Sequence, residues 1–200
     1  RDAQESRGLG DVYKRQQAFW ENSTACGAIA RALARRARTG NADDLFLAGL
    51  LHAVGRLVFY ARRPVHYREI LRPGLSGQAL AAEERRVFGF DHAELGAALL
   101  AAWRLPALLI TAVAYQLRPL QAPAFIREVA MLHVAQDMAA GMAPQLKTNG
   151  PPADYRPSFD PAVGTRLGLD PAILPEIRQE ALLDAVEILE IINPRASLIY

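Results

Sequence analysis

Residues 48–59, with the sequence A-G-L-L-H-A-V-G-R-L-V-F, constrain the fold more than any other part of the chain. The larger apolar side chains in and just before this stretch share one face of a helical wheel, at the i, i+3, i+4, i+7 spacing of a helix packed on a core. They are Leu47, Leu50, Leu51, Val54, Leu57 and Val58. We therefore predict one buried helix that continues to about Tyr60.

The opposite face of this helix carries small residues and one histidine. Its members are Ala48, Gly49, His52, Ala53 and Arg56. Glycine inside a helix costs about 1 kcal/mol relative to alanine unless close packing offsets the loss. A second helix is therefore expected to approach this face, with His52 between the two.

Helix start and stop signals recur along the rest of the chain. Asn41 is a candidate N-cap for the central helix, and Asp91 with Glu94 forms a capping-box pattern. Further helices are predicted over residues 17–38, 65–71, 76–88, 92–103, 108–115 and 124–140, and after Asp160 and Asp170, with the last including 182–192. No segment alternates with period two, so we expect an all-α, multi-helix bundle without a sheet.

Length and composition exclude several classes of protein. A chain of 200 residues can bury a sizeable core, and 23 basic against 21 acidic residues leave a net charge of +2. The basic residues are not gathered in one run, so nucleic acid is not an expected partner. No stretch reaches the roughly 18 uncharged apolar residues of a membrane span, and no signal peptide is visible. We expect a soluble, cytoplasmic protein.

The ends of the chain differ in composition from its middle. Residues 1–16 are polar without apolar periodicity, and residues 8–16 (G-L-G-D-V-Y-K-R-Q) look like a translated sequencing adapter. We predict that 1–16 form a non-native, disordered tail, that 17–193 form the domain, and that 194–200 form a second tail. Glycine and proline make residues 141–158 the candidate for a flexible loop.

Four sequence blocks together resemble the HDOD domain, the HD-related output domain of bacterial signalling proteins. They are F-W-E-N-S (19–23), A-G-L-L-H-A-V-G-R-L (48–57), F-G-F-D-H-A-E-L-G (88–96) and W-R-L-P (103–106). A late block, L-H-V-A-Q-D (132–137), is also similar. Because the family usually has a further helical half before the first block, the resemblance implies that this chain is a C-terminal part of such a domain.

The resemblance also raises the question of a metal site. Related HD phosphohydrolases hold a divalent metal with a histidine, an adjacent His-Asp pair and a later aspartate, and the metal activates water. The corresponding positions here carry Asn22, His52 with Ala53, and Gln136. Alanine cannot coordinate, and neutral amides suit a hard dication poorly. We therefore expect a vestigial site with no metal, no cofactor and no catalytic residue.

Other residues leave alternatives open. Asp91, His92, His133 and Asp137 could rebuild a metal or acid-base site beside His52. Histidines in helical cores more often hydrogen-bond a backbone carbonyl or a carboxylate, so we favour packed histidines.

Several other candidates have ordinary structural explanations. The basic side chains at two helix ends, Arg31, Arg35, Arg36 and Arg38 in one group and Arg62 and Arg63 in the other, complement the helix dipole, and a phosphate or nucleotide contact is the alternative. Trp20, Trp103 and Cys26 are expected in the core, and Cys26, the one cysteine, excludes an internal disulfide.

The resulting functional prediction is a non-catalytic signalling output module. It would bind a protein partner or a small ligand, including a nucleotide or cyclic dinucleotide, in a bacterial pathway. We expect that surface near five residues: His52, Arg56, Asp91, His92 and His133. The alternative is a metal-dependent phosphohydrolase acting on nucleotides or cyclic dinucleotides, and a third class is a nucleic-acid binder using the face from Arg31 to Arg38. A membrane partner is not expected.

Overall fold

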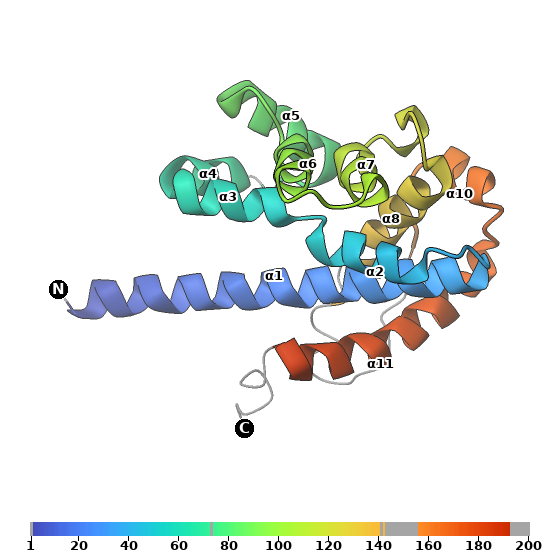
Figure 1. Ribbon diagram of the computed structural model, residues 1–200. Helices are drawn as coiled ribbons and strands as arrows, with labels where there is room; N and C mark the ends of the chain where they lie inside the picture. The colour runs from blue at the N-terminus through green and yellow to red at the C-terminus, as the bar shows by residue number, and fades with distance from the viewer. Residues whose placement is uncertain (1, 73, 141, 143–155, 193–200) are drawn as a thin grey trace.

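The chain folds into a bundle of helices (Figure 1). The computed structural model describes residues 2–72, 74–140, 142 and 156–192, and no strand occurs within these ranges. The all-α prediction is therefore confirmed. The helices are α1 (Asp2–Arg36), α2 (Ala42–Leu51), α3 (Val54–Arg62), α4 (Pro64–Leu71), α5 (Gly77–Phe88), α6 (His92–Ala102), α7 (Ala107–Tyr115), η1 (Pro119–Gln121), α8 (Ile126–Ala139), α10 (Pro161–Leu167), η2 (Pro171–Ile173) and α11 (Leu174–Ile192).

Helix α1 is the long axis of the molecule, with α2 packed on one side and α11 on the other (Figure 1). Its buried positions are mostly small, including Ala25, Cys26 and Ala28, so neighbouring backbones can approach closely. At Gly49 of α2, an added Cβ atom would lie 2.5 Å from the Cα of Gly27 in α1. The predicted close approach at the glycine face is confirmed.

The central segment differs from its prediction in two ways. It forms two helices, α2 and α3, with a turn at His52 and Ala53 between them. The small-residue face is also the buried one: Ala48 and Gly49 are inaccessible or nearly so, whereas Leu57 is 38 % exposed. The predicted core face is therefore confirmed only in part: Val54 is buried and Leu47 and Leu51 pack against core clusters, while the glycines on the other face let other helices approach at backbone distance.

A second close contact joins α3 to α6. A Cβ atom on Gly55 would lie 2.1 Å from the carbonyl oxygen of His92 and 2.9 Å from the amide nitrogen of Gly96. Because no side chain fits between these backbones, α3 and α6 are held in one relative position. The contact places the start of α3 against the start of α6, and the His52 carbonyl accepts a hydrogen bond from Gln116 at the end of α7.

Most predicted helix boundaries are confirmed to within two residues. Asp91 accepts a hydrogen bond from the Glu94 amide and Glu94 accepts one from the Asp91 amide, which completes the capping box. Asp160 caps α10, and Asp170 caps the short η2 turn that leads into α11. Asn41 occupies the N-cap position of α2 without capping it, because its side-chain amide donates to Glu128 instead.

The predicted tails and loop fall partly outside the described residues. Helix α1 begins at Asp2, so 2–16 continue the helix where a disordered tail was predicted. Their adapter-like origin stays a prediction. Most of the predicted loop, residues 143–155, and all of 194–200 lie outside the described ranges.

One stretch, Ala42–Arg62, is long and apolar enough to cross a membrane by length and composition alone. It is interrupted by the turn at His52 and Ala53, and 44 % of its most apolar window is buried against other helices. One such segment is weak evidence for a membrane span, because buried core helices pass the same test of length and composition.

Candidate functional site

Three positions of the expected vestigial site lie in one hydrogen-bonded network. Asn22 comes from α1, His52 from the turn between α2 and α3, and Gln136 from α8. The Asn22 side-chain nitrogen lies 3.4 Å from Nε2 of His52. The Gln136 amide donates to the side-chain oxygen of Gln116, a residue that directly follows α7.

Gln116 connects the two sides of this network. Its side-chain nitrogen donates to the His52 carbonyl at 3.0 Å and to the Val113 carbonyl at 2.9 Å. Its own backbone carbonyl lies 2.7 Å from Nδ1 of His133. Because Gln116 is fully buried, these bonds satisfy an amide that would otherwise be costly to place in the core.

His52 is held in one tautomer. Its Nδ1 lies 2.6 Å from the Gly49 carbonyl, which can only accept, so Nδ1 carries the hydrogen. The lone pair therefore sits on Nε2, facing the amide of Asn22. Burial lowers the pKa of His52 to about 3, opposed by the Gly49 hydrogen bond and aided by electrostatic interactions with Arg56 and His92. His52 is neutral at physiological pH.

The residues of this network do not fit a divalent metal. It offers one imidazole lone pair and neutral amide oxygens, and Ala53, the position that the HD resemblance assigns to a carboxylate, cannot coordinate. Hard cations in proteins are bound chiefly by charged oxygen ligands. Within the described part of the chain, no three His, Cys, Asp or Glu side chains are placed to share a metal ion.

A second buried polar cluster was missed by the sequence analysis. The Tyr67 hydroxyl donates to Glu84 at 2.7 Å, and the other Glu84 oxygen accepts from the backbone nitrogen of His92 at 2.8 Å and from its Nδ1 at 2.6 Å. Burial acts to raise the pKa of Glu84, but the bonds from His92 and Tyr67 outweigh it and hold the pKa below its ordinary value. Glu84 is therefore an ionised carboxylate inside the fold.

The four residues proposed for a rebuilt site have separate partners. His92 pairs with Glu84, and Asp91 forms an ion pair with Arg85 besides capping α6. Asp137 accepts from the backbone nitrogen of Ser158 at 3.0 Å. His133 contacts the His52 network, through the Gln116 carbonyl. These contacts favour packed histidines over ligands.

The expected partner surface is not an open one. His52 is 5 % exposed, and Asp91 and His92 are each 1 % exposed, while Arg56 and His133 are half-buried. A partner surface near these residues stays a prediction, but three of the five side chains are buried rather than exposed on it. The capping-box pattern could have shown this for Asp91, because a cap side chain turns back onto its own helix.

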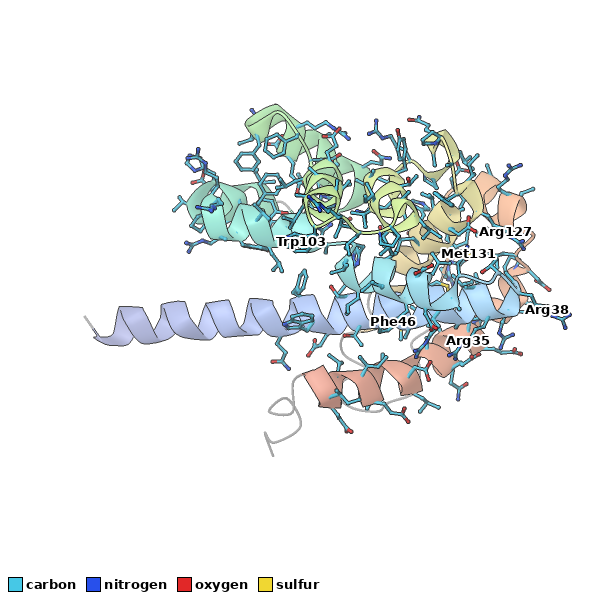
Figure 2. All side chains as sticks on the ribbon, in the orientation of Figure 1. Arg35, Arg38, Phe46, Trp103, Arg127 and Met131 are labelled. Carbon is cyan, nitrogen blue, oxygen red and sulfur yellow. The ribbon has the colours of Figure 1, made fainter. Side chains whose placement is uncertain are left out.

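The basic end of α1 is partly used for packing. Arg31 pairs with Asp184 of α11 at 2.8 Å and lies over the Phe46 ring, and Arg36 approaches Glu176 at 3.3 Å. Arg35 and Arg38 are exposed at the C-terminal end of α1 (Figure 2). Arg31 and Arg36 thus connect α1 to α11, besides lying at the helix end where positive charge complements the dipole.

Two of the three residues expected in the core are confirmed at least in part. Cys26 is fully buried, and burial raises the pKa of its thiol well above the ordinary value. Trp20 is half-buried. Trp103 is 55 % exposed, so its prediction was wrong. It occupies the C-cap of α6, where the chain turns at the surface into the Arg104 bend.

Comparison with known proteins identifies the family. The HDOD domain profile matches residues 6–119, and the match begins within the segment predicted to be a tail. The chain belongs to the HDOD domain family. Among curated proteins, none matches the chain.

Solved structures share this fold. The MmoQ response regulator of Methylococcus capsulatus str. Bath is 28 % identical, with a TM-score of 0.58 over 80 % of this chain and 60 % of its own. An HDOD domain protein with unknown function from Geobacter sulfurreducens is 23 % identical, with a TM-score of 0.58 over 91 % and 61 %. A proposed phosphohydrolase from Shewanella amazonensis SB2B is 24 % identical, with a TM-score of 0.63 over 85 % and 64 %. The chain thus spans about three fifths of each solved chain.

Proposed function

We propose that this HDOD chain is a non-catalytic signalling module, which acts in a bacterial cytoplasmic pathway by binding rather than by bond cleavage. The single observation that supports the proposal is the neutral network of Asn22, His52, Gln116 and Gln136. By the HD resemblance, Asn22, His52 and Gln136 correspond to metal-ligand positions of related hydrolases.

The chemistry of phosphoester hydrolysis explains why this network argues against catalysis. A bound dication lowers the pKa of its water and offsets charge that develops on the phosphate oxygens. Here the Nε2 lone pair of His52 faces an amide donor, and its Nδ1 is bound to a carbonyl. Neither ring nitrogen is placed to act as a base toward a substrate without first breaking this arrangement.

The solved relatives favour a role in signalling. The relative whose name says that it is a response regulator is 28 % identical to this chain. The relative named as a proposed phosphohydrolase is 24 % identical, and the similarity to it shows only a shared fold.

Metal analysis and a phosphodiesterase assay test the proposal together. The purified chain is dialysed against Mn²⁺, its metal content is measured, and turnover of bis(p-nitrophenyl) phosphate is followed. We expect no stoichiometric metal and no turnover. Stoichiometric metal together with turnover abolished by His52→Ala would overturn the proposal.

A matched variant shows whether the missing ligands are the reason. Asn22→His, Ala53→Asp and Gln136→Asp, made together, restore the ligand types that the HD resemblance implies. We expect this triple variant to bind Mn²⁺ more tightly than the native chain by at least about tenfold, or 1.4 kcal/mol. Equal Mn²⁺ affinity for the two proteins would contradict the assignment of these positions to a vestigial site.

A further inference from the structure

A groove of about 480 Å³ lies among α3, α4 and the connection from α5 to α6, away from the His52 network. Its volume falls within the roughly 300–1,000 Å³ of small-molecule sites. Three phenylalanines and three basic residues line it: Phe59, Phe88 and Phe90, and Arg62, Arg63 and His66. None of these residues belonged to the site expected from the sequence, apart from the two arginines noted as a possible phosphate contact.

The floor of this groove is a stack of aromatic rings. The Phe59 ring lies 4.7 Å from that of Phe88 and 5.7 Å from that of Phe90, at interplanar angles of 22° and 14°. Gly89 ends α5 with a φ of 84°, a left-handed conformation that brings Phe90 back over α3. Phe90 remains 42 % exposed, so it offers an apolar surface for a further ring.

The rim carries uncompensated positive charge. Arg62, Arg63 and His66 are exposed, and no ion pair or hydrogen bond from their side chains is found among the described residues. Other arginines do have carboxylate partners, among them Arg31, Arg36, Arg85 and Arg86. The groove lining itself contains no acidic residue within the described chain. An anion would meet two guanidinium groups without competition.

We propose that this groove binds a small organic anion that combines an aromatic ring with a phosphate, phosphonate or carboxylate group. The ring would lie on Phe90, and the anionic group would be held by Arg62 and Arg63, since the guanidinium fork matches such oxygens in bidentate fashion. This names a ligand class for the signalling module and rests on that proposed function.

The groove is also connected to the buried polar cluster. Phe59 stacks on Tyr67, with ring centroids 5.1 Å apart, and the Tyr67 hydroxyl donates to Glu84, the partner of His92. A ligand on Phe90 would therefore be connected, through the Phe59 and Tyr67 rings, to Glu84 and His92, which join α5 to α6. The amide signals of residues 84 and 92 are accordingly useful reporters in a titration.

Calorimetric and NMR titration of the full chain at 150 mM salt tests the proposal. The probe is phenylphosphonate, which has no ester bond to hydrolyse. Methylphosphonate supplies the charge without the ring, and benzyl alcohol the ring without the charge. We expect phenylphosphonate to bind at least about tenfold more tightly than either half-ligand.

Two double variants distinguish the groove from general basic character. Arg62→Gln with Arg63→Gln should weaken phenylphosphonate binding by about tenfold or more, because both contacts to the anion are lost. Arg35→Gln with Arg38→Gln removes the same charge from exposed positions at and just beyond the end of α1 and should leave binding unchanged. Phe90→Ala should remove the preference for phenylphosphonate over methylphosphonate. All five side chains are exposed, so the fold is expected to survive, which circular dichroism checks.

Three outcomes would overturn the groove proposal: no binding at millimolar probe, equal binding of methylphosphonate and phenylphosphonate, or equal loss in the two arginine double variants. The metal-content and turnover measurements do not involve this groove. A failed groove titration with no metal and no turnover therefore leaves the non-catalytic assignment standing, whereas metal-dependent turnover would contradict that assignment whatever the titration shows.

Discussion

At the scale of single residues, burial and hydrogen bonding keep one histidine neutral. His52 is buried, its Nδ1 is bound to the Gly49 carbonyl, and its pKa is lowered to about 3 from 6.5. As the pH falls, the ring therefore becomes protonated in the unfolded chain well before it does in the folded chain. This difference links the stability of the fold to pH.

The first prediction concerns that linkage. Between pH 6.5 and about 3, His52 is protonated in the unfolded chain and neutral in the folded chain. The free energy of unfolding should therefore fall as the pH falls. The largest contribution from one group is about 1.4 kcal/mol per pH unit. Urea unfolding from pH 7 to 5 measures it above the range where carboxylates titrate.

Two variants isolate the His52 contribution. His52→Gln should flatten the dependence on pH, because the titrating ring is gone. His66→Gln removes an exposed histidine and should keep the slope of the native chain. If the slopes of both variants equal that of the native chain, another group causes the pH dependence and the burial argument for His52 is wrong.

The second prediction concerns the Tyr67 hydroxyl. Tyr67→Phe removes a donor at 2.7 Å from the buried, ionised Glu84, and should lower the free energy of unfolding by about 1.5–3 kcal/mol, as for hydrogen bonds to charged groups. Tyr115→Phe, at a half-buried tyrosine, should change it by no more than about 0.5 kcal/mol. Chemical denaturation of both variants gives the comparison. Equal losses would show that the Glu84 contact contributes nothing specific.

At the scale of elements, glycines decide how the helices meet. Gly55 lets α3 approach α6 so closely that an added Cβ atom would lie 2.1 Å from a backbone oxygen of His92. Backbone atoms cannot rotate away as the end of a flexible side chain can. The contact therefore fixes the distance between the two helices, and through the turn at His52 and Ala53 it also fixes the start of α3.

The third prediction tests this contact. Gly55→Ala should destabilise the chain by about 1–3 kcal/mol or more, because the helices must separate to admit the methyl group. Gly40→Ala is the matched control, since an added Cβ there meets nothing within 4 Å. Thermal unfolding followed by circular dichroism compares the two. A Gly55→Ala variant as stable as Gly40→Ala would mean that α3 and α6 are not in close contact.

At the scale of the whole molecule, α1 holds the bundle together because it contacts α2, α8 and α11. Helix α11 lies along it opposite α2 (Figure 1), and it places Ile177, Ala181 and Ala185 in the main core. The Arg31–Asp184 pair adds a part-buried ionic contact between the two helices. Helix α11 is thus a structural part of the domain rather than an appendage.

The fourth prediction measures how much α11 contributes. Ile177→Ala empties a fully buried site and should cost about 2–5 kcal/mol of unfolding free energy. Ile191→Ala makes the same chemical change on the same helix at a position 79 % exposed, and should cost no more than about 0.5 kcal/mol. Equal effects in urea unfolding would show that α11 does not pack on α1 as described.

Local signals account for what the sequence predicted well. The Asp91–Glu94 capping box, the prolines after Asp160 and Asp170, and the glycine spacing at Gly49 all act within one or two turns of helix. The resemblance in the blocks around His52 and Asp91 led to the family that the profile match shows. Such local patterns predict the structure well because their partners are near neighbours in the sequence.

Long-range partners explain what the sequence could not predict. Glu84 and Tyr67 carry no local sign that they will meet His92, and the lone amide of Gln116 at the end of an apolar helix was the available hint of a buried network. The break at His52 and the burial of the small-residue face depend on how closely α1 and α6 approach.

The sequence by itself therefore determined the helical class, most helix ends and the family, and through the HD resemblance it predicts that Asn22, Ala53 and Gln136 replace metal ligands. Only the tertiary structure decided that Asn22, His52, Gln116 and Gln136 share one neutral network, and that Phe90, Arg62 and Arg63 share one groove. The physical reason is that helix propensity and capping act between near neighbours, whereas burial, pKa and pairing depend on which distant backbones can come into contact.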